Sequence, residues 1–428
     1  MKTLNDWLSH VETLHAKTID LGLDRIKAMI RKMDIRFDCP ILLVGGTNGK
    51  GSTCTCLEQV LLAAGYHVGV HTSPHLIRFN ERARIDGKIV TDEDLLPYFE
   101  KVEALRGETT LSYFEYTLLV ILMMFQARGL DVLVLEIGLG GRLDAVNALE
   151  PSGAIVTTVG VDHTQFLGNT REEIGLEKAH IYRAGKPAVC ADPLPPSTLV
   201  EHAKEIGADF ITSTDASEAT YAFTHLDGSA TWTYRFKDEE AIELPLPSLP
   251  GEHQIRNAAG ALTLLFSLRD KLPFTTEAVK KGLQSMRVTG RFEIIRHDPE
   301  VVLDVGHNPH AAYALRDTLK AENFKGRTVA VFGMLADKDR EHVCEILKDS
   351  FDEWFVADLE GPRGGSAEDL VKLLSACGVA TEKMHSFEKV KDALSAALGG
   401  ASGTDRIVIF GSFLTVSAAV EALDLTVN

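Results

Sequence analysis

Apolar residues in the first half of the chain follow two alternating patterns. Short, β-branched runs of strand length are separated by longer stretches in which apolar residues recur at helical spacing. The strand-like runs cover residues 41–45, 66–71, 131–136, 153–159 and 187–191, and the helix-like stretches cover 52–64, 115–128 and 171–183. This alternation predicts a parallel sheet flanked by helices.

A different pattern follows at residues 221–247. The segments "YAFTHL", "ATWTYRF" and "AIELPLP" read as short strands around the turn-forming "DGS". They predict an antiparallel patch at the edge of the first domain. Two helices are expected after it, at residues 253–270 and 275–286.

A second alternation begins after "RHDPE" at residues 296–300. Its strand-like runs are 301–305, 328–334, 353–359, 381–386 and 406–412, and its helix-like stretches are 311–321, 340–350, 367–377 and 388–398. Because 428 residues exceed what one compact core usually holds, two domains are expected. We predict a larger α/β domain over residues 1–296 and a smaller α/β domain over residues 297–428.

Composition and charge narrow the class of protein. The chain is 45% hydrophobic with a mean hydropathy of +0.01, which is typical of a soluble globular enzyme. The apolar run at 117–125 is too short to span a membrane, and the N-terminus lacks the apolar core of a signal peptide, so a cytoplasmic protein is expected. The formal net charge of −17 argues against nucleic acid or an anionic membrane as a partner.

The cysteines are scattered and form no C-x-x-C pair. The chain contains Cys39, Cys54, Cys56, Cys190, Cys344 and Cys377. Two of them, Cys54 and Cys56, fall within one predicted helix, where positions i and i+2 do not share a face. Buried free thiols are therefore expected rather than a zinc site or disulfides.

The octapeptide "GGTNGKGS" at residues 45–52 is similar to a phosphate-binding loop, although its spacing differs from the common G-x-x-x-x-G-K-[ST]. Val44 stands where the first glycine would be, and Ser52 comes one residue late. The loop lies between a strand-like run and a helix-like stretch, an order that aims unpaired N–H groups and the helix dipole at one spot. Lys50 adds a positive charge. We interpret the octapeptide as a nucleotide loop, with an ordinary glycine-rich turn as the alternative.

Polar residues follow several predicted strands, at the edge where open α/β sheets bind ligands. Glu136 ends a buried run and suits Mg²⁺, which prefers oxygen ligands. His163 follows the next strand, and Ser73 follows the second one in a segment that also carries Arg78 and Arg82. An ordinary strand-end carboxylate, a structural histidine and a polar loop are the respective alternatives.

The second domain repeats this arrangement. Asp304, His307 and Asn308 follow the strand-like "VVLDV", and Gly411 and Ser412 follow "RIVIF". Two domains that both offer strand-end polar groups suggest a substrate-filled cleft between them.

Together these motifs resemble the folylpolyglutamate synthase/dihydrofolate synthase branch of the Mur ligases, whose phosphate loop is "GTNGKGS". The resemblance covers nearly the whole chain, through "TSPHLIRFNER", "LEIGLGGRLDAVN", "VDHTQFLG", "EKAHI", "VTGRFE", "LDVGHNPHAA", "GMLADKD", "LEGPRGG" and "GSF". "IDLGLDRI" (19–26) and "LSYFEYT" (111–117) resemble the bifunctional bacterial enzymes that also accept dihydropteroate. The resemblance implies an ATP-binding domain with a pterin pocket, followed by a smaller Rossmann-like domain that binds glutamate.

The resemblance also implies roles for individual residues. The ATP contacts would be Thr47, Asn48, Gly49, Lys50, Gly51, Ser52, Asn257, Arg291 and Asp304. The magnesium ligands would be Ser73, Glu136 and His163. Lys178 matches the lysine that is carbamylated in the family, although His180 stands where the family usually has glycine.

The acid substrate and the incoming glutamate have sites of their own in this family. The dihydropteroate pocket would comprise Asp20, Leu21, Gly22, Leu23, Ser112, Tyr113, Phe114, Glu115, Leu143, Asp144 and Ala145. His307 and Ser412 match the glutamate site. Lys50, Lys178 and His307 are the residues expected to act in catalysis.

The implied activity is ATP-dependent ligation of L-glutamate to dihydropteroate and to reduced folates through an acyl phosphate. ATP and Mg²⁺ would be the cofactors, a monovalent cation such as K⁺ is compatible with them, and a monomer with small-molecule partners only is expected. A Mur cell-wall ligase shares the loop, but those enzymes place a uridine-nucleotide domain before it, and 44 residues precede Gly45 here. A monofunctional folylpolyglutamate synthase and a nucleotide-dependent regulatory or binding protein are also compatible with the motifs.

Overall fold

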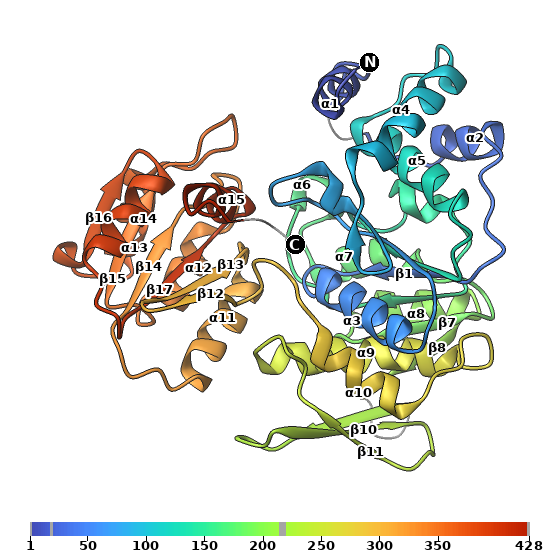
Figure 1. Ribbon diagram of the computed structural model, residues 1–428. Coiled ribbons are helices and arrows are strands. Elements are labelled where there is room, and N and C mark those ends of the chain that lie inside the picture. Colours follow the sequence, from blue (N-terminus) through green and yellow to red (C-terminus); the bar gives the residue numbers. More distant parts are fainter. Residues whose placement is uncertain (1, 18–19, 214–219, 426–428) are drawn as a thin grey trace. The chain divides into compact units, whose positions relative to one another are not determined.

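The computed structural model describes residues 2–17, 20–213 and 220–425 (Figure 1). Backbone contacts divide the chain into two compact units. Unit 1 comprises Met1–Ser248 and Ile255–Met286, and unit 2 comprises Leu249–Gln254 and Arg287–Asn428. The expected fold class, a parallel α/β domain joined to a smaller α/β domain, is confirmed.

The main sheet of unit 1 has, within the described residues, eight strands in the order β4-β3-β2-β5-β1-β6-β7-β8. Their bounds are β1 (Ile41–Gly45), β2 (Val68–His71), β3 (Ala83–Ile85), β4 (Lys88–Ile89), β5 (Val132–Glu136), β6 (Gly153–Val156), β7 (Pro187–Cys190) and β8 (Asp209–Thr212). β3 is antiparallel to β2 and β4, and the other pairs are parallel. The five strands predicted in this region are all present, and they pair with one another in parallel.

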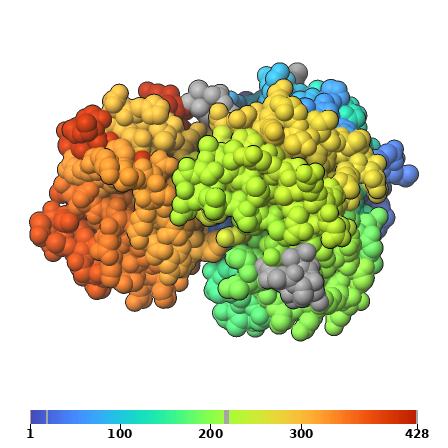
Figure 2. All heavy atoms as spheres, turned by 90° about the horizontal axis from the view of Figure 1, so that it is seen from below, coloured from blue at the N-terminus to red at the C-terminus, as the bar shows by residue number. Residues whose placement is uncertain are grey.

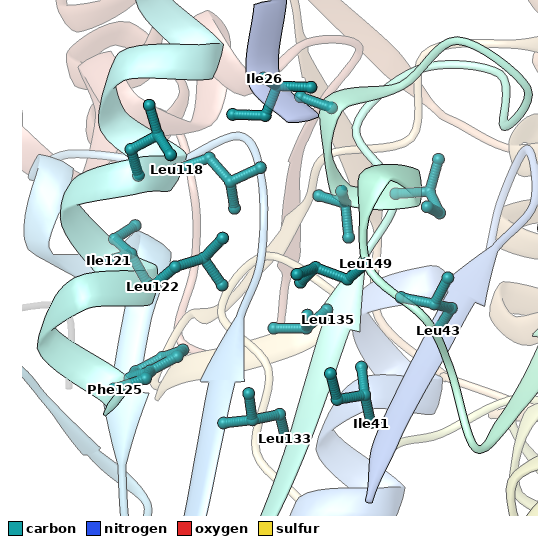
Figure 3. Close-up of a cluster of buried hydrophobic side chains, with 14 of the residues drawn as sticks. Ile26, Ile41, Leu43, Leu118, Ile121, Leu122, Phe125, Leu133, Leu135 and Leu149 are labelled. Carbon is teal, nitrogen blue, oxygen red and sulfur yellow. The ribbon is translucent and has the colours of Figure 1, made fainter. Parts of the chain in front are cut away.

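Helix α5 (Tyr113–Gln126) forms much of the core on one side of this sheet. Its Leu118, Leu122 and Phe125 lie beside Leu133 and Leu135 of β5 (Figure 3). The expectation that residues 117–125 form a helix rather than a membrane span is confirmed, since no helix in the described part of the chain is long and apolar enough to cross a membrane.

Other helices complete unit 1. They are α1 (Leu4–Glu12), α2 (Asp24–Lys32), α3 (Lys50–Ala63), α4 (Asp92–Arg106), α6 (Thr164–Leu167), α7 (Arg171–Ala179), α8 (Ser197–Glu205), α9 (Glu252–Ser267), α10 (Thr276–Ser285) and the 3₁₀ turns η1 (Phe79–Arg82) and η2 (Ala145–Ala148). The hydrophobic pattern did not predict α1, α2 or α4. Thr3 and Thr91 cap α1 and α4 in reciprocal capping boxes with Asp6 and Asp94, so aspartate takes the place of the usual glutamate.

The predicted antiparallel patch is a separate sheet in the order β11-β10-β9. Its strands are β9 (Tyr221–His225), β10 (Thr231–Phe236) and β11 (Ile242–Pro245). Alternate residues of β10 are buried, and Tyr234 packs on Phe266 of α9 with ring centroids 5.4 Å apart. This sheet lies on the side of unit 1 that faces the viewer in Figure 2.

Unit 2 contains a sheet in the order β12-β13-β17-β14-β15-β16. Its elements are β12 (Glu293–His297), β13 (Glu300–Asp304), α11 (Pro309–Ala321), β14 (Thr328–Phe332), α12 (Arg340–Leu347), β15 (Glu353–Ala357), α13 (Ala367–Ala376), η3 (Thr381–Lys383), β16 (Met384–Phe387), α14 (Val390–Gly399), β17 (Arg406–Phe410) and α15 (Phe413–Ala422). β12 pairs antiparallel with β13, and the other strands are parallel. Because β12 joins this sheet, the long segment of unit 2 begins at Arg287, before the boundary expected near residue 296.

All six cysteines are free thiols, as expected. Cys54, Cys56, Cys190 and Cys344 are buried, and burial raises the pKa of Cys56 to about 12. Cys39 and Cys377 are only half-buried, so the expectation of burial is wrong for these two.

Candidate active site

The glycine-rich loop joins β1 directly to the N-terminus of α3. Gly46 has φ +142° and Gly49 has φ +87°, both in the region that side chains with a Cβ rarely adopt. A Cβ on Gly49 would overlap the side-chain amide of Asn257, and one on Gly46 would overlap Thr157. The helix begins at Lys50, so the unpaired N–H groups of its first turn open into this loop.

Two threonines at the end of β6 hold the loop in place. The Thr47 amide donates to the Thr158 carbonyl (2.7 Å), and the Asn48 amide donates to the Thr158 hydroxyl (3.1 Å). The Thr157 hydroxyl donates to the Asn48 carbonyl (2.6 Å). The amides of Thr47 and Asn48 therefore serve the scaffold, which leaves the N–H groups of the helix start for an anion.

Lys50 bends back over the loop that precedes it. Its Nζ donates to the carbonyls of Gly46 (3.1 Å) and Thr47 (3.2 Å). Burial raises the pKa of Asp144 and lowers the pKa of Lys178; the Lys50 charge opposes the first effect and adds to the second. The ammonium group is thus held over the loop by carbonyls that a bound phosphate could replace.

The residues expected to bind metal lie at or after the carboxyl ends of β2, β5 and β6; β2 and β5 are neighbours in the sheet, and β1 lies between β5 and β6. Glu136 is the last residue of β5 and is buried, and one of its carboxylate oxygens accepts the Ser73 amide at 3.3 Å. His163 caps α6 with φ +51°, and its amide donates to Asp162 (2.8 Å). Among the described residues no three His, Cys, Asp or Glu side chains form a ready-made metal site. One buried carboxylate and a hydroxyl suit Mg²⁺, which commonly keeps water and takes phosphate oxygens.

Lys178, on α7, is 3% exposed. Burial lowers its pKa to about 7, with a further contribution from the Lys50 charge, while Asp162 and Asp144 act in the opposite direction. Beside it, Gly141 approaches α7 closely, since a Cβ there would lie 2.5 Å from the Glu177 carbonyl. A large fraction of Lys178 is therefore a neutral amine near neutral pH.

Three segments predicted for dihydropteroate meet in unit 1. The Gly22 amide donates to the Leu143 carbonyl (3.2 Å). Arg25 donates from Nη1 to Asp20 (2.6 Å) and from Nη2 to the buried Glu115 (3.1 Å). Residues 20–23, 112–115 and 143–145 are thus tied together, although Ile19 of the "IDLGLDRI" motif lies outside the described residues.

The side chains of these segments differ in burial. Leu21, Gly22, Leu23, Tyr113 and Phe114 are half-buried, Ser112 and Ala145 are buried, and Leu143 is exposed. Phe114 lies against Gly138, where a Cβ would be 2.9 Å from the ring. Leu23, Tyr113 and Phe114 thus pack against the core of unit 1, and each remains partly exposed.

Asp144 supports the same region. It is 2% exposed and accepts the amides of Leu139 and Val146, both at 2.9 Å. Burial raises its pKa to about 6, against the effect of these hydrogen bonds. Asp20 differs, because its bonds to Arg25 and Lys17 lower its pKa to about 2.

In unit 2 the predicted residues gather at the ends of two paired strands, β13 and β17. Asp304 accepts the amides of Phe292 (3.1 Å) and Gly306 (2.8 Å); burial raises its pKa, and the Arg291 charge opposes that rise. Ser412 caps α15, and the neighbouring Phe413 ring lies 6.2 Å from the His307 ring. His307 and Ser412 thus follow two strands that pair side by side.

Comparisons with known proteins show which family the chain belongs to. The Mur ligase middle domain matches residues 44–265, and the Mur ligase glutamate ligase domain matches residues 290–413. A dihydrofolate synthase/folylpolyglutamate synthase of Escherichia coli K12 is 42% identical over 98% of this chain and 96% of its own, and the Haemophilus influenzae protein of that name is 38% identical over 97% and 96%. The chain belongs to the dihydrofolate synthase/folylpolyglutamate synthase family.

Solved structures of family members agree with this assignment. E. coli FolC in complex with DHPP and ADP superposes with a TM-score of 0.90 at 40% identity, covering 99% of this chain and 98% of that one. A Yersinia pestis member complexed with AMPPNP and Mn has the same TM-score and identity, with 99% of each chain covered. The expectations of an ATP-dependent ligase, and of a nucleotide and a divalent metal as its cofactors, are confirmed at the level of this family.

Several residues that shape the site were not predicted from the sequence. Thr157 and Thr158 stand at the end of a predicted buried strand, where two successive hydroxyls were the available signal. Arg25 lies inside the "IDLGLDRI" motif, but its partner Glu115 is 90 residues away. Arg171 and Asp192 both hold Val159, the residue after these threonines, and the family motifs gave no signal for that pair.

Proposed function

We propose that this enzyme joins L-glutamate to 7,8-dihydropteroate, which makes dihydrofolate, and also extends reduced folates to polyglutamates. The observation that carries this proposal is that hydrogen bonds of Arg25 and of the Gly22 amide to the Leu143 carbonyl connect residues 20–23, 112–115 and 143–145. These segments match the dihydropteroate pocket of bifunctional members. In the same unit they accompany the phosphate loop that would hold ATP.

The chemistry needs an activated carboxyl group. A carboxylate is a poor acyl donor, so one of its oxygens first attacks the γ-phosphorus of ATP, which forms an acyl phosphate and releases ADP. The amine of glutamate then attacks the carbonyl carbon, the C–O bond to phosphate breaks, and the amine loses a proton. Lys50 and the first N–H groups of α3 offset the charge between the two anions.

The residues for ATP and metal follow from the same assignment. The residues proposed to bind the nucleotide are Thr47, Asn48, Gly49, Lys50, Gly51, Ser52, Asn257, Arg291 and Asp304. Ser73, Glu136 and His163 would hold Mg²⁺, which supplies positive charge to the phosphate oxygens when bound. A carbamate formed from CO₂ and the neutral Lys178 amine would add a carboxylate to this region, and the lowered pKa of Lys178 supports that step.

The two expected domains are proposed to divide the substrates. Residues 1–296 would carry the pterin pocket and all the ATP contacts except Asp304, and residues 297–428 would carry Asp304 together with the glutamate residues His307 and Ser412. Exclusion of water would protect the acyl phosphate from hydrolysis. We further propose that the protein is a monomer that works in the cytoplasm, where six free cysteines persist and ATP is available.

The proposal is tested by the substrate dependence of ADP release. ADP should form only when ATP, Mg²⁺, L-glutamate and a pteroyl acid are all present, and Lys50→Ala should abolish it while thermal unfolding stays unchanged. Nucleotide binding without glutamate-dependent turnover would favour a regulatory binding protein instead. More than about a tenth of the wild-type kcat/KM in Lys50→Ala, a loss under ~1.4 kcal/mol, would contradict its phosphate role.

A further inference from the structure

A buried ion pair in unit 1 has no role in the proposed chemistry. Glu58, on α3, is 1% exposed, and Arg84, on β3, pairs with it. Arg84 Nε donates to both Glu58 carboxylate oxygens, at 3.1 and 3.0 Å, and Nη2 donates to one of them at 2.9 Å. Across the part of the chain that the structure describes, Glu58 is the carboxylate that pairs with Arg84. These three hydrogen bonds fix the orientation of the guanidinium.

The register of the main sheet places this arginine on the same face as Glu136. Arg84 lies opposite Val70 of β2, and Val70 lies opposite Val134 of β5. Side chains at paired positions point to the same face of a sheet, and so do residues two apart on one strand. Glu136 follows Val134 by two residues. Arg84 and Glu136 therefore share one face, two strands apart, which is a separation of about 10 Å across the sheet.

Helix α3 packs against β2 and β5 and brings further charges to this face. Lys50, Cys54 and Glu58 follow one another at intervals of four residues, so they lie on one side of the helix. Burial raises the pKa of the Cys54 thiol, and the negative charges of Glu136 and Glu58 add to this rise. The positive charges of Arg84 and Lys50 oppose it. Cys54 thus lies within electrostatic reach of two cations and two carboxylates.

These charges bear on Glu136, the carboxylate expected to bind Mg²⁺. Burial disfavours the charged form of Arg84, but Glu58 and, to a smaller extent, Glu136 outweigh this effect and raise the pKa of the guanidinium. Glu136 is therefore the next carboxylate that Arg84 could approach if Glu58 lost its charge. An arginine in its strongest geometry takes both oxygens of a carboxylate, and such a carboxylate serves Mg²⁺ poorly. A buried cation that has lost its counter-ion is strongly unfavourable, which would drive this change.

We propose that Glu58 is a positioning residue of the metal site, because it holds Arg84 and thereby prevents this cation from competing with Mg²⁺ for Glu136. The inference rests on the proposed function, in which Glu136 is a magnesium ligand. It makes the two members of the ion pair unequal. Loss of the Glu58 charge releases a competitor, whereas loss of Arg84 removes the competitor. A purely structural ion pair would respond alike to the loss of either partner.

The test measures the binding of Mn²⁺, in place of Mg²⁺, with the non-hydrolysable ATP analogue AMPPNP, by electron paramagnetic resonance and without turnover. Glu58→Gln keeps the shape of the side chain but removes its charge, and it should weaken Mn²⁺ binding by about ten-fold or more. Arg84→Gln should bind Mn²⁺ at least as tightly as wild type. The double variant should return to within about three-fold of wild type. Glu103→Gln is the matched control at the Glu103–Arg106 pair of α4, and it should leave Mn²⁺ binding unchanged.

Thermal unfolding in EDTA follows the fold without metal. Glu58→Gln should unfold at a lower temperature than wild type, and the double variant should recover part of this loss, since an unpaired buried charge costs more than an absent pair. If Glu58→Gln does not fold, Arg84→Gln and the double variant decide. Mn²⁺ binding close to wild type in both would support the inference, and weaker binding in either would overturn it.

Three results with folded variants would also overturn the inference: unchanged Mn²⁺ binding in Glu58→Gln, equal weakening in Glu58→Gln and Arg84→Gln, or a loss that the double variant does not recover. Weakening of the same size in Glu103→Gln would attribute the effect to general destabilisation and count against it as well. Glu136→Gln separates this inference from the proposed function. If that variant binds Mn²⁺ as tightly as wild type, the proposed metal site fails first, and the role of Glu58 fails with it.

Discussion

Arg25 donates two hydrogen bonds to Glu115, a residue 90 positions further along the chain: Nε to Oε1 at 3.2 Å and Nη2 to Oε2 at 3.1 Å. Glu115 is 2% exposed and also accepts the Ser112 amide at 2.9 Å. The same arginine binds Asp20 through Nη1. One side chain therefore fixes the distance between two segments assigned to the dihydropteroate pocket.

Arg25→Met should loosen this pocket. The buried Glu115 carboxylate would lose its cationic partner, which costs about 1–3 kcal/mol of unfolding free energy. KM for dihydropteroate should rise, and KM for ATP should change little. Urea unfolding and steady-state kinetics check both. Arg36→Met, which removes an exposed ion pair to Asp34, serves as the control. It should change the free energy of unfolding by no more than about 1 kcal/mol and should leave KM for dihydropteroate unchanged. Equal effects of the two variants would contradict a role for Arg25 in positioning.

Two glycines of the phosphate loop should respond differently to alanine. Gly49 has φ +87° and faces Asn257, so Gly49→Ala should cost about 1–2 kcal/mol in backbone strain, plus the displacement of Asn257. Gly51 has open space within 4 Å of its Cβ position and lies in α3, so Gly51→Ala should preserve the fold. Thermal unfolding compares them, with ATP affinity measured in parallel. Equal stability of the two variants would show that the close approach of Gly49 to Asn257 is unimportant.

The pKa of Lys178 predicts a pH dependence of stability. Its folded value of about 7 lies below the ordinary value of 10.5, so between these two pH values the unfolded chain binds a proton that the folded chain does not. Stability should therefore rise with pH from about 7 to 10.5, and part of this slope should be absent in Lys178→Met. Denaturant unfolding in CO₂-free buffer measures it. Identical slopes in the two proteins would mean that Lys178 is solvated and charged.

The same amine should react with CO₂ only when it is neutral. We expect activity to fall on removal of CO₂ and to return with bicarbonate, more completely above pH 7 than below it. Intact-protein mass should show one added CO₂ on wild type, and Lys178→Met should lack it. If activity does not depend on bicarbonate at any pH, the prediction of a carbamate on Lys178 is wrong.

Phe114 should distinguish the two acid substrates. Its half-buried ring lies over Gly138 and 5.9 Å from the His71 ring, among the segments assigned to the pterin pocket. Dihydropteroate lacks the glutamyl tail that helps hold a folate, so Phe114→Ala should reduce dihydrofolate synthesis more than glutamate addition to tetrahydrofolate. Phe99→Ala, at a fully buried position, serves as the control: it should cost roughly 3–5 kcal/mol of stability and reduce both activities alike. Equal loss of both activities in Phe114→Ala would indicate destabilisation alone.

Much of the fold could be predicted because it rests on local pattern. The buried runs of β1 and β5 read as strands, since a parallel sheet covered on both faces needs continuous apolar residues. Helix α4 was missed because it is strongly charged and its capping box uses Asp94 in place of glutamate. β12 was missed because the half-buried Glu293 and the exposed Arg296 interrupt its apolar pattern, although it pairs with β13.

The site likewise contains residues that the sequence predicts and contacts that only the fold reveals. Strand-end residues such as Glu136 and the glycine loop were visible in sequence, because topology alone places them at one edge of the sheet. The contact of Arg25 with Glu115 and the hold of Thr158 on Thr47 join positions about a hundred residues apart.

The most direct measurement offers the purified wild-type protein ATP, Mg²⁺ and L-glutamate with either dihydropteroate or tetrahydrofolate, and identifies the products by mass. We expect dihydropteroate to gain one glutamyl residue and tetrahydrofolate to gain one or more, each with release of ADP. A protein that extends tetrahydrofolate but leaves dihydropteroate unchanged would contradict the bifunctional assignment and support a monofunctional folylpolyglutamate synthase.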